Sequence, residues 1–213
     1  MKSASVEITN KQTSQNAPLE YFLTQMRTKK ILPWVKDKRV LDFGCGLHYS
    51  TLKAMGPHCQ SAVGFDISFP KDLIVTKEGF RLVKSLDLCG SEKFDCVTSL
   101  ACFEHLTSEE LIDNLHKLAD ITTRDAHIVG TVPRPSAKPV LEFLSYKLHL
   151  IDESQIRDHK VYYDRISLGA VLSKSPWYIA EYSTFQFGFN SLFVFRKKQH
   201  DKATSQPNYP SIQ

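Results

Sequence analysis

The 213-residue sequence lacks any long apolar run. Its first residues are polar and do not contain the roughly 7 to 15 apolar residues of a secretory signal peptide. No segment approaches the roughly 18 consecutive apolar residues that a membrane-spanning helix requires. We therefore expect a cytoplasmic protein without a membrane span.

Cysteine pairs with a recognisable spacing are also missing. The five cysteines are an odd number and form no C-x-x-C pair, and no Cys/His spacing is typical of zinc. Cytosolic proteins rarely form disulfides, so we expect reduced and mostly buried thiols and no metal held by cysteine.

The sequence has almost no excess charge outside its first residues. Residues 1–39 contain eight basic and three acidic residues, whereas the remainder contains 19 basic and 20 acidic residues. A duplex-binding protein would carry a basic stripe across its fold, so this balance argues against a nucleic-acid partner. A basic N-terminal arm could still contact an anionic partner.

One domain, over residues 16–198, is expected between two mobile tails, 1–15 and 199–213. Both tails are polar and show no apolar periodicity. Asn16 and Pro18 predict the start of a helix that ends before Pro33.

Short apolar runs alternate with helical patterns through the domain. A capping box over Thr107–Glu110 predicts one helix, and a second is expected over Ser50–Met55. The alternation predicts an α/β fold with a mainly parallel sheet covered on both faces. The five expected buried strands are Arg39–Phe43, Ser61–Asp66, Phe80–Val83, Phe94–Ser99 and Ala126–Val132.

The C-terminal part of the domain has a different pattern. Trp177–Phe187 and Phe189–Phe195 are aromatic-rich runs that meet around Gly188. Two strands joined so directly can pair only as an antiparallel hairpin. The sheet should therefore end in an antiparallel strand.

Acidic residues follow three of the expected strands. Asp42 lies at the end of the first strand, before the glycines Gly44 and Gly46, while Asp66 and Asp87 follow the second and third. Two glycines in a strand-to-helix turn let a ligand approach bare backbone, and an acid after the second strand can accept both hydrogen bonds of a ribose diol. Three acids at one edge suit a cationic, ribose-bearing ligand better than a diphosphate.

In this context the residues resemble the class I S-adenosylmethionine (SAM) dependent methyltransferases, in particular small stand-alone enzymes of sugar and surface-polysaccharide biosynthesis. The resemblance implies a Rossmann-like, doubly wound sheet of seven strands, mostly parallel with an antiparallel last strand. His48 stands where the family often has a third glycine. The resemblance covers about residues 18–198 and rests on Val40–Gly46, Gly64–Asp66, Ser85–Leu88, Phe94–Leu106 and the closing hairpin.

The resemblance also implies roles for individual residues around SAM. A side chain added at Gly44 is expected to enter the space of SAM rather than the core. The implied contacts are Asp42, Gly44 and Gly46 around the methionyl part, Asp66 at the ribose, Ile67 and Leu88 at the adenine faces, Asp87 at the adenine amino group, and Leu100 and Ala101 beside the sulfonium.

Candidate catalytic residues follow the fourth strand and a later insertion. Glu104 and His105 come just after the strand, where a histidine could remove a proton from a hydroxyl acceptor. By resemblance, an insertion over about residues 134–165 roofs the acceptor pocket and presents His159 as a second candidate. Each of the two histidines could instead be structural or solvated.

Three further residues are candidates for contact with the acceptor. By the same resemblance, Tyr162 or Tyr163 would lie beside the catalytic histidine. Arg134, after the fifth strand, could hold a phosphate or carboxylate group of the acceptor.

The main hypothesis is O-methylation of a small molecule or a sugar or glycan intermediate. A second hypothesis is an RNA 2′-O-methyltransferase with a divalent metal at Glu104, His105 and His159, although Ala101 stands where those enzymes have a fourth ligand. The sequence also leaves open a non-catalytic SAM-binding protein and a nicotinamide-dependent oxidoreductase. The oxidoreductase motif G-x-G-x-x-G would require a glycine at Tyr49.

Overall fold

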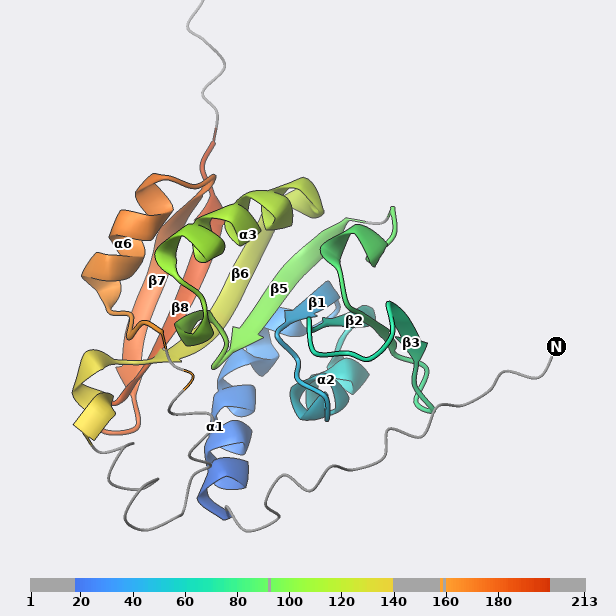
Figure 1. The fold of residues 1–213 in the computed structure, drawn as a ribbon, viewed down its shortest axis with the longest axis horizontal. Helices are drawn as coiled ribbons and strands as arrows, with labels where there is room; N and C mark the ends of the chain where they lie inside the picture. Colours follow the sequence, from blue (N-terminus) through green and yellow to red (C-terminus); the bar gives the residue numbers. More distant parts are fainter. Residues whose placement is uncertain (1–17, 92, 140–157, 159, 200–213) are drawn as a thin grey trace, which may run out of the picture.

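The computed structural model describes residues 18–91, 93–139, 158 and 160–199 (Figure 1). Apart from Gln199, both expected tails lie outside the described residues. So do residues 140–157, which make up most of the insertion, and His159.

The core is one eight-stranded sheet in the order β3-β4-β2-β1-β5-β6-β8-β7. The central strands are parallel, whereas β8 is antiparallel to both of its neighbours. The strands are β1 (Arg39–Phe43), β2 (Ser61–Phe65), β3 (Leu73–Val75), β4 (Arg81–Val83), β5 (Phe94–Leu100), β6 (Thr122–Pro133), β7 (Trp177–Phe185) and β8 (Asn190–Lys197).

All five expected central strands and the closing hairpin are confirmed, but the count of seven strands is wrong. The additional strand, β3, pairs antiparallel with β4 at the edge of the sheet. It is only three residues long and buries a single side chain, Ile74. So short a strand produces no alternating hydrophobic pattern that the sequence would reveal.

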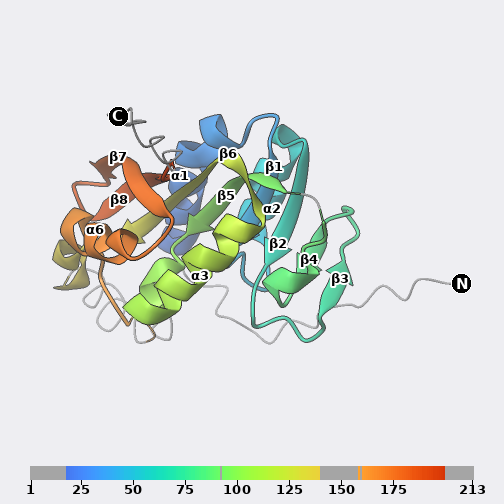
Figure 2. The same cartoon turned by 90° about the horizontal axis from the view of Figure 1, so that it is seen from above.

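Helices cover both faces of the sheet (Figure 2). One face packs against α1 (Pro18–Val35) and α2 (Ser50–Met55), and the other against α3 (Ser108–Asp120) and α6 (Arg165–Ser173). The expected capping box of α3 is present, with Thr107 and Glu110 each bonding the backbone of the other. None of the described helices is long and apolar enough to cross a membrane.

Helix α1 continues two residues beyond Pro33, so the expectation that it ends before this proline is wrong. Proline costs the helix one backbone hydrogen bond because it has no N–H. Its neighbours Ile31 and Val35 are fully buried against the sheet. The burial of these two side chains offsets the hydrogen bond lost in the last turn.

The closing hairpin is held to the rest of the domain through buried aromatic residues. The indole nitrogen of Trp177, the first residue of β7, donates to the carbonyl of Leu115 in α3 at 2.8 Å. Phe193 and Phe195 of β8 stack on Phe103, which lies just after β5. The hairpin thus packs beneath the segment that follows β5.

A partly buried ion pair joins β1 to β5 at the amino ends of these strands, whereas the glycine turn lies at the carboxyl end of β1. Arg39 donates to both carboxylate oxygens of Asp95 at 2.9 Å, and Thr123 of β6 donates to one of them at 3.3 Å. The hydrogen bonds from Arg39 hold the pKa of Asp95 at about 2.

Asp95→Asn should lower the free energy of unfolding by about 1–2 kcal/mol at pH 7, because it removes the charge that pairs with Arg39. The folded pKa of Asp95 lies below that of an unfolded aspartate, about 4. The difference from the wild type should therefore be complete above about pH 4 and shrink as the pH falls toward 2. Urea unfolding at pH 7 and pH 3 measures it.

Asp113→Asn, on an exposed position of α3, is the matched control and should change stability by less than about 0.5 kcal/mol at either pH. Equal stability of Asp95→Asn and wild type at pH 7 would contradict the assignment.

Candidate functional site

The chain turns at the end of β1 by bonding to the end of β2. The amides of Gly44 and Cys45 both donate to the carbonyl of Phe65, at 2.8 and 3.1 Å. The next glycine amide, of Gly46, donates to a carboxylate oxygen of Asp66 at 2.8 Å. Both glycines have positive φ, 76° and 69°, which favours glycine at each position.

The two glycines face different surroundings. A Cβ at Gly44 would lie 2.2 Å from Sγ of Cys102, whereas a Cβ at Gly46 would meet nothing within 4 Å. The expectation that a side chain at Gly44 would only enter ligand space is therefore wrong, because Cys102 already fills that side of the turn. Gly46 is the glycine that borders open space.

Asp66 is positioned by three donors. One carboxylate oxygen accepts from Gly46, and the other accepts from the amide of Ser68 at 2.9 Å and from its hydroxyl. The neighbouring Ile67 is 73% exposed, an unusual position for isoleucine. A carboxylate fixed beside an exposed apolar side chain is an arrangement that a ribose and an adjoining base would complement.

The next strand along this edge, β4, is also followed by a carboxylate beside an exposed apolar side chain. Leu88 is 38% exposed in the turn after β4, and Asp87 is exposed beside it. The hydroxyl of Ser85 donates to Asp87 at 3.1 Å. Because β1, β2 and β4 are parallel neighbours, their carboxyl ends bring Asp42, Asp66 and Asp87 to one edge of the sheet.

Asp42 differs from the other two acids because it is only 2% exposed. One of its oxygens accepts a hydrogen bond from the hydroxyl of Thr98 at 2.7 Å, and the other has no hydrogen-bond partner among the described residues. Burial raises the pKa of Asp42 to about 7; the charge of Asp66 acts in the same direction, and the Thr98 hydrogen bond opposes it. The site therefore holds a costly carboxyl group that a cationic or hydrogen-bonding ligand would relieve.

Sequence reasoning missed Thr98 and Cys102. Thr98 is the register partner of Asp42 across β1 and β5. Cys102 packs against Gly44 from the turn after β5. Both residues lie within the Phe94–Leu106 motif, but the motif does not show what they contact, so only the pairing of strands that lie far apart in the chain could have revealed their roles.

The segment after β5 closes the site on its other side. Leu100 and Ala101 are half-buried, and Ala101 has a positive φ of 51° while its amide bonds the carbonyl of Thr131 at 3.0 Å. Glu104 is 1% exposed. Burial raises the pKa of Glu104 to about 7, and the charge of Arg27 in α1 opposes this shift.

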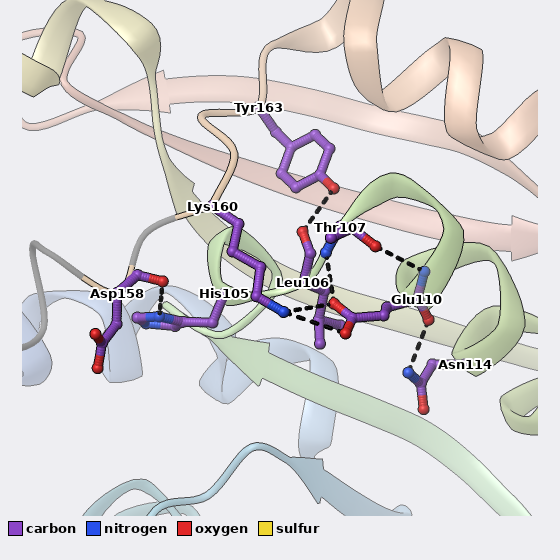
Figure 3. A network of polar contacts seen from close by, with 8 residues as sticks. All are labelled: His105, Leu106, Thr107, Glu110, Asn114, Asp158, Lys160 and Tyr163. Carbon is purple, nitrogen blue, oxygen red and sulfur yellow. Dashed lines mark hydrogen bonds and ion pairs between the residues drawn. The ribbon is translucent and has the colours of Figure 1, made fainter.

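His105 is oriented by a backbone carbonyl, as Figure 3 shows. Its Nδ1 lies 3.1 Å from the carbonyl oxygen of Asp158. A carbonyl can only accept, so Nδ1 carries the hydrogen and, in the neutral ring, the lone pair is on Nε2. Nε2 is therefore the basic nitrogen of the neutral ring.

The backbone on both sides of His159 lies against the turn that contains His105. The amides of Lys160 and Val161 donate to the carbonyl of Glu104 at 2.8 and 3.1 Å, and the Lys160 ammonium pairs with Glu110 (Figure 3). The two candidate histidines thus belong to segments that the structure brings together. His159 itself lies outside the described residues.

The three candidate acceptor residues are placed differently from one another. Tyr163 is fully buried in the core and its hydroxyl donates to the carbonyl of Leu106 at 3.3 Å, so it does not face an acceptor. Tyr162 is half-buried, with the Lys138 ammonium 5.9 Å from its ring centre. Arg134 donates to the carbonyl of Gly188 at 3.2 Å, which connects it to the β7–β8 turn.

Within the part of the chain that the structure describes, no group of three or more His, Cys, Asp and Glu side chains could hold a metal ion. His159, the third ligand expected in the RNA-directed hypothesis, lies outside the described residues.

Comparisons with known proteins agree with this architecture. The comparison with curated proteins finds no significant match. The structure resembles the N-methyltransferase NodS from Bradyrhizobium japonicum WM9, solved with S-adenosyl-L-homocysteine (TM-score 0.59, 15% identity, covering 90% of this chain and 94% of NodS). It also resembles a SAM-dependent methyltransferase from Archaeoglobus fulgidus (TM-score 0.60, 17% identity, 83% and 94% covered).

A third similar structure is the O-methyltransferase NcsB1 from neocarzinostatin biosynthesis, solved with SAM and a hydroxynaphthoic acid (TM-score 0.60, 9% identity, 84% of this chain and 57% of that one). At these identities the three structures show a shared fold. Independently, residues 19–177 match the family model described as a methyltransferase domain. The chain therefore belongs to the methyltransferase-domain family, within the class I methyltransferases that use S-adenosylmethionine as cofactor.

Proposed function

We propose that this methyltransferase binds SAM across the carboxyl ends of β1, β2 and β4 and methylates a hydroxyl group of a small molecule or of a sugar or glycan intermediate. Three features fit the cofactor: the open space beside Gly46, the buried Asp42 oxygen without a described partner, and the exposed apolar side chains Ile67 and Leu88. All of them complement a cationic nucleoside.

Different residues at this edge would contact different parts of the cofactor. Asp66 would accept hydrogen bonds from the ribose hydroxyls: the oxygen bonded by Gly46 keeps a further lone pair, and the other would exchange its bond from the Ser68 hydroxyl for one from the ribose. The adenine ring would lie between Ile67 and Leu88, near Asp87. The turn from Asp42 through Gly44 to Gly46 would hold the methionyl part, and Leu100 with Ala101 would line the wall beside the sulfonium.

SAM supplies a methyl group on a sulfonium, whose sulfur is already a good leaving group. The protein therefore has mainly to align the acceptor oxygen with the methyl carbon. Nε2 of His105 would take the hydroxyl proton as the new oxygen–carbon bond forms, because the Asp158 carbonyl holds the proton of the ring on Nδ1. This orientation of His105, just past β5, is the observation that carries the proposal.

The acceptor class is supported by NcsB1, whose structure holds a small hydroxylated acid. Incubation with SAM and a metabolite extract, followed by mass spectrometry, tests the function. We expect a product heavier than its precursor by one methyl group in place of a hydrogen. Methylation of RNA alone would contradict the proposal.

Asp66→Asn should weaken SAM binding by roughly 2 kcal/mol or more, because the charge and one acceptor oxygen at the ribose are lost. Ser68→Ala is the matched control: it removes one donor to Asp66 but keeps the carboxylate, so affinity should change only a few-fold. Calorimetric titration measures both. Unchanged affinity in Asp66→Asn, or preference of the wild type for NAD over SAM, would refute the assignment.

Gly46→Ala should abolish most SAM binding while the protein remains folded, since its Cβ would project into open space that the cofactor needs. Gly79→Ala controls for backbone strain, because Gly79 also has a positive φ and open surroundings but lies in the β3–β4 turn at the other edge of the sheet. Both variants should lose a similar stability, about 1–2 kcal/mol. Circular dichroism checks that both variants fold, and calorimetric titration measures their SAM affinity. Equal SAM affinity in the two variants would mean that the cofactor binds elsewhere.

His105→Ala should reduce turnover roughly 100-fold or more while leaving SAM affinity unchanged, because only proton removal from the acceptor is lost. His116→Ala, on α3 and bonded to the carbonyl of Lys174, should behave as the wild type. Release of S-adenosyl-L-homocysteine with the metabolite extract measures turnover. Turnover of the variant is the readout in place of a pH profile, because burial raises the pKa values of both Asp42 and Glu104 to about 7.

Two further arms separate the metal-independent step from a metal-dependent one. Chelator should have no effect if the enzyme is metal-independent, whereas a divalent ion at Glu104, His105 and His159 would make chelation and either histidine substitution equally damaging. Full activity in the His105→Ala and His159→Ala double variant would contradict both versions.

A further inference from the structure

A cavity lies at the edge of the sheet opposite the candidate cofactor site. Its volume is about 610 Å³, within the range of small-molecule sites. Strands β5 and β6 end at the cofactor edge, whereas β8 ends at this one (Figure 1). The lining residues come from the beginnings of β6 and β7 and from the end of β8: Arg124, Asp125, Ala126, Tyr178, Arg196, Lys197, Lys198 and Gln199.

The lining is strongly basic, with four cationic side chains and one acid, although the body of the chain is close to neutral. Burial lowers the pKa of Lys197, and the nearby charge of Lys93 acts in the same direction. Burial also lowers the pKa of His127, and the charge of Arg196 adds to this shift. The positive charges at this edge are therefore close enough to disfavour one another.

The four cations have different partners. The Lys197 ammonium donates to the carbonyls of Ala119 and Thr122 at 2.8 and 3.0 Å, and the Lys198 ammonium to those of Leu172 and Ser175 at 2.8 and 2.7 Å. Both lysines are thus fixed in place by backbone. Among the described residues, neither Arg124 nor Arg196 has a side-chain hydrogen bond or ion pair.

Arg196 also has an aromatic neighbour. In the sheet it lies directly opposite Tyr178 of β7 on one side and His127 of β6 on the other. Residues opposite one another on neighbouring strands point to the same face. Tyr178 is 44% exposed in the cavity, an unusual exposure for so large a ring.

From this combination we infer a second binding site, separate from the methyl-transfer site, for a small phosphate monoester that carries a planar ring. Guanidinium groups match the geometry of phosphate oxygens and can bind them bidentately. The ring of Tyr178 offers a stacking surface for the planar part. Asp125, the one acid of the cavity, would accept a hydroxyl or amino hydrogen of the same ligand.

Calorimetric titration of the full-length chain with phenyl phosphate and with inorganic phosphate, at constant ionic strength, tests the inference. Phenyl phosphate should bind more tightly than inorganic phosphate. Arg124→Gln and Arg196→Gln should each weaken both ligands roughly tenfold or more, since each removes charge-assisted hydrogen bonds. Tyr178→Leu should remove the preference for phenyl phosphate and leave inorganic phosphate unaffected.

Arg165→Gln, at an exposed position of α6 outside the cavity, is the matched control and should bind as the wild type. All variants should keep the wild-type SAM affinity, because the cavity lies at the other edge of the sheet. Equal phosphate binding in the wild type and the double arginine variant would overturn the inference. So would a single-stranded oligonucleotide that binds more tightly than phenyl phosphate and depends on the same arginines, since that would indicate a nucleic-acid surface.

Discussion

The two hydrogen bonds from Gly44 and Cys45 to the carbonyl of Phe65 determine the shape of the candidate site. They bend the chain at the end of β1 over the end of β2, which brings the amide of Gly46 onto Asp66. The bend needs positive φ at two nearby glycines, and at Gly44 it also needs the absence of a side chain beside Cys102. The position of the Asp66 carboxylate, the open space at Gly46 and the packing of the post-β5 turn all depend on this one bend.

Buried carboxyl groups surround that bend at a cost to stability. Asp42 and Glu104 are almost completely buried, and burial raises the pKa of each to about 7. Each is partly compensated from a different element: Thr98 of β5 donates to Asp42, and the charge of Arg27 in α1 acts on Glu104. Such groups are understandable where a cationic ligand would bind, because the charge of the ligand would offset the cost of burying the carboxylates.

The direction of the strands separates the two kinds of charge. Parallel strands place Asp42, Asp66 and Asp87 at their carboxyl ends, while the reversed β8 carries Arg196 and two lysines to the opposite edge. Although the charge of the domain is close to neutral overall, the sheet therefore has an acidic edge that suits a cationic cofactor and a basic edge that suits an anion. The length of the strands separates the two edges.

Local patterns in the sequence were sufficient to predict much of this protein. Hydrophobic runs identified the five central strands, the Thr107 capping box identified α3, and the glycine turn with Asp66 indicated the family. These features depend on residues close together in the chain, so a single sequence displays them. The end of α1 was mistaken because the burial of Ile31 and Val35, which outweighs the effect of Pro33, depends on a distant sheet.

Tertiary structure alone decided the partners of the site residues. Thr98 reaches Asp42 through the register of two strands, Tyr163 turns into the core, and the carbonyl of Asp158 orients His105 across more than 50 residues of chain. The cationic cavity likewise joins residues from three strands that are adjacent only in the folded sheet. Sequence alone determined which chemical groups the protein possesses and the order of its elements, whereas the pairing of remote strands decided which of those groups meet, because that pairing is a property of the whole sheet.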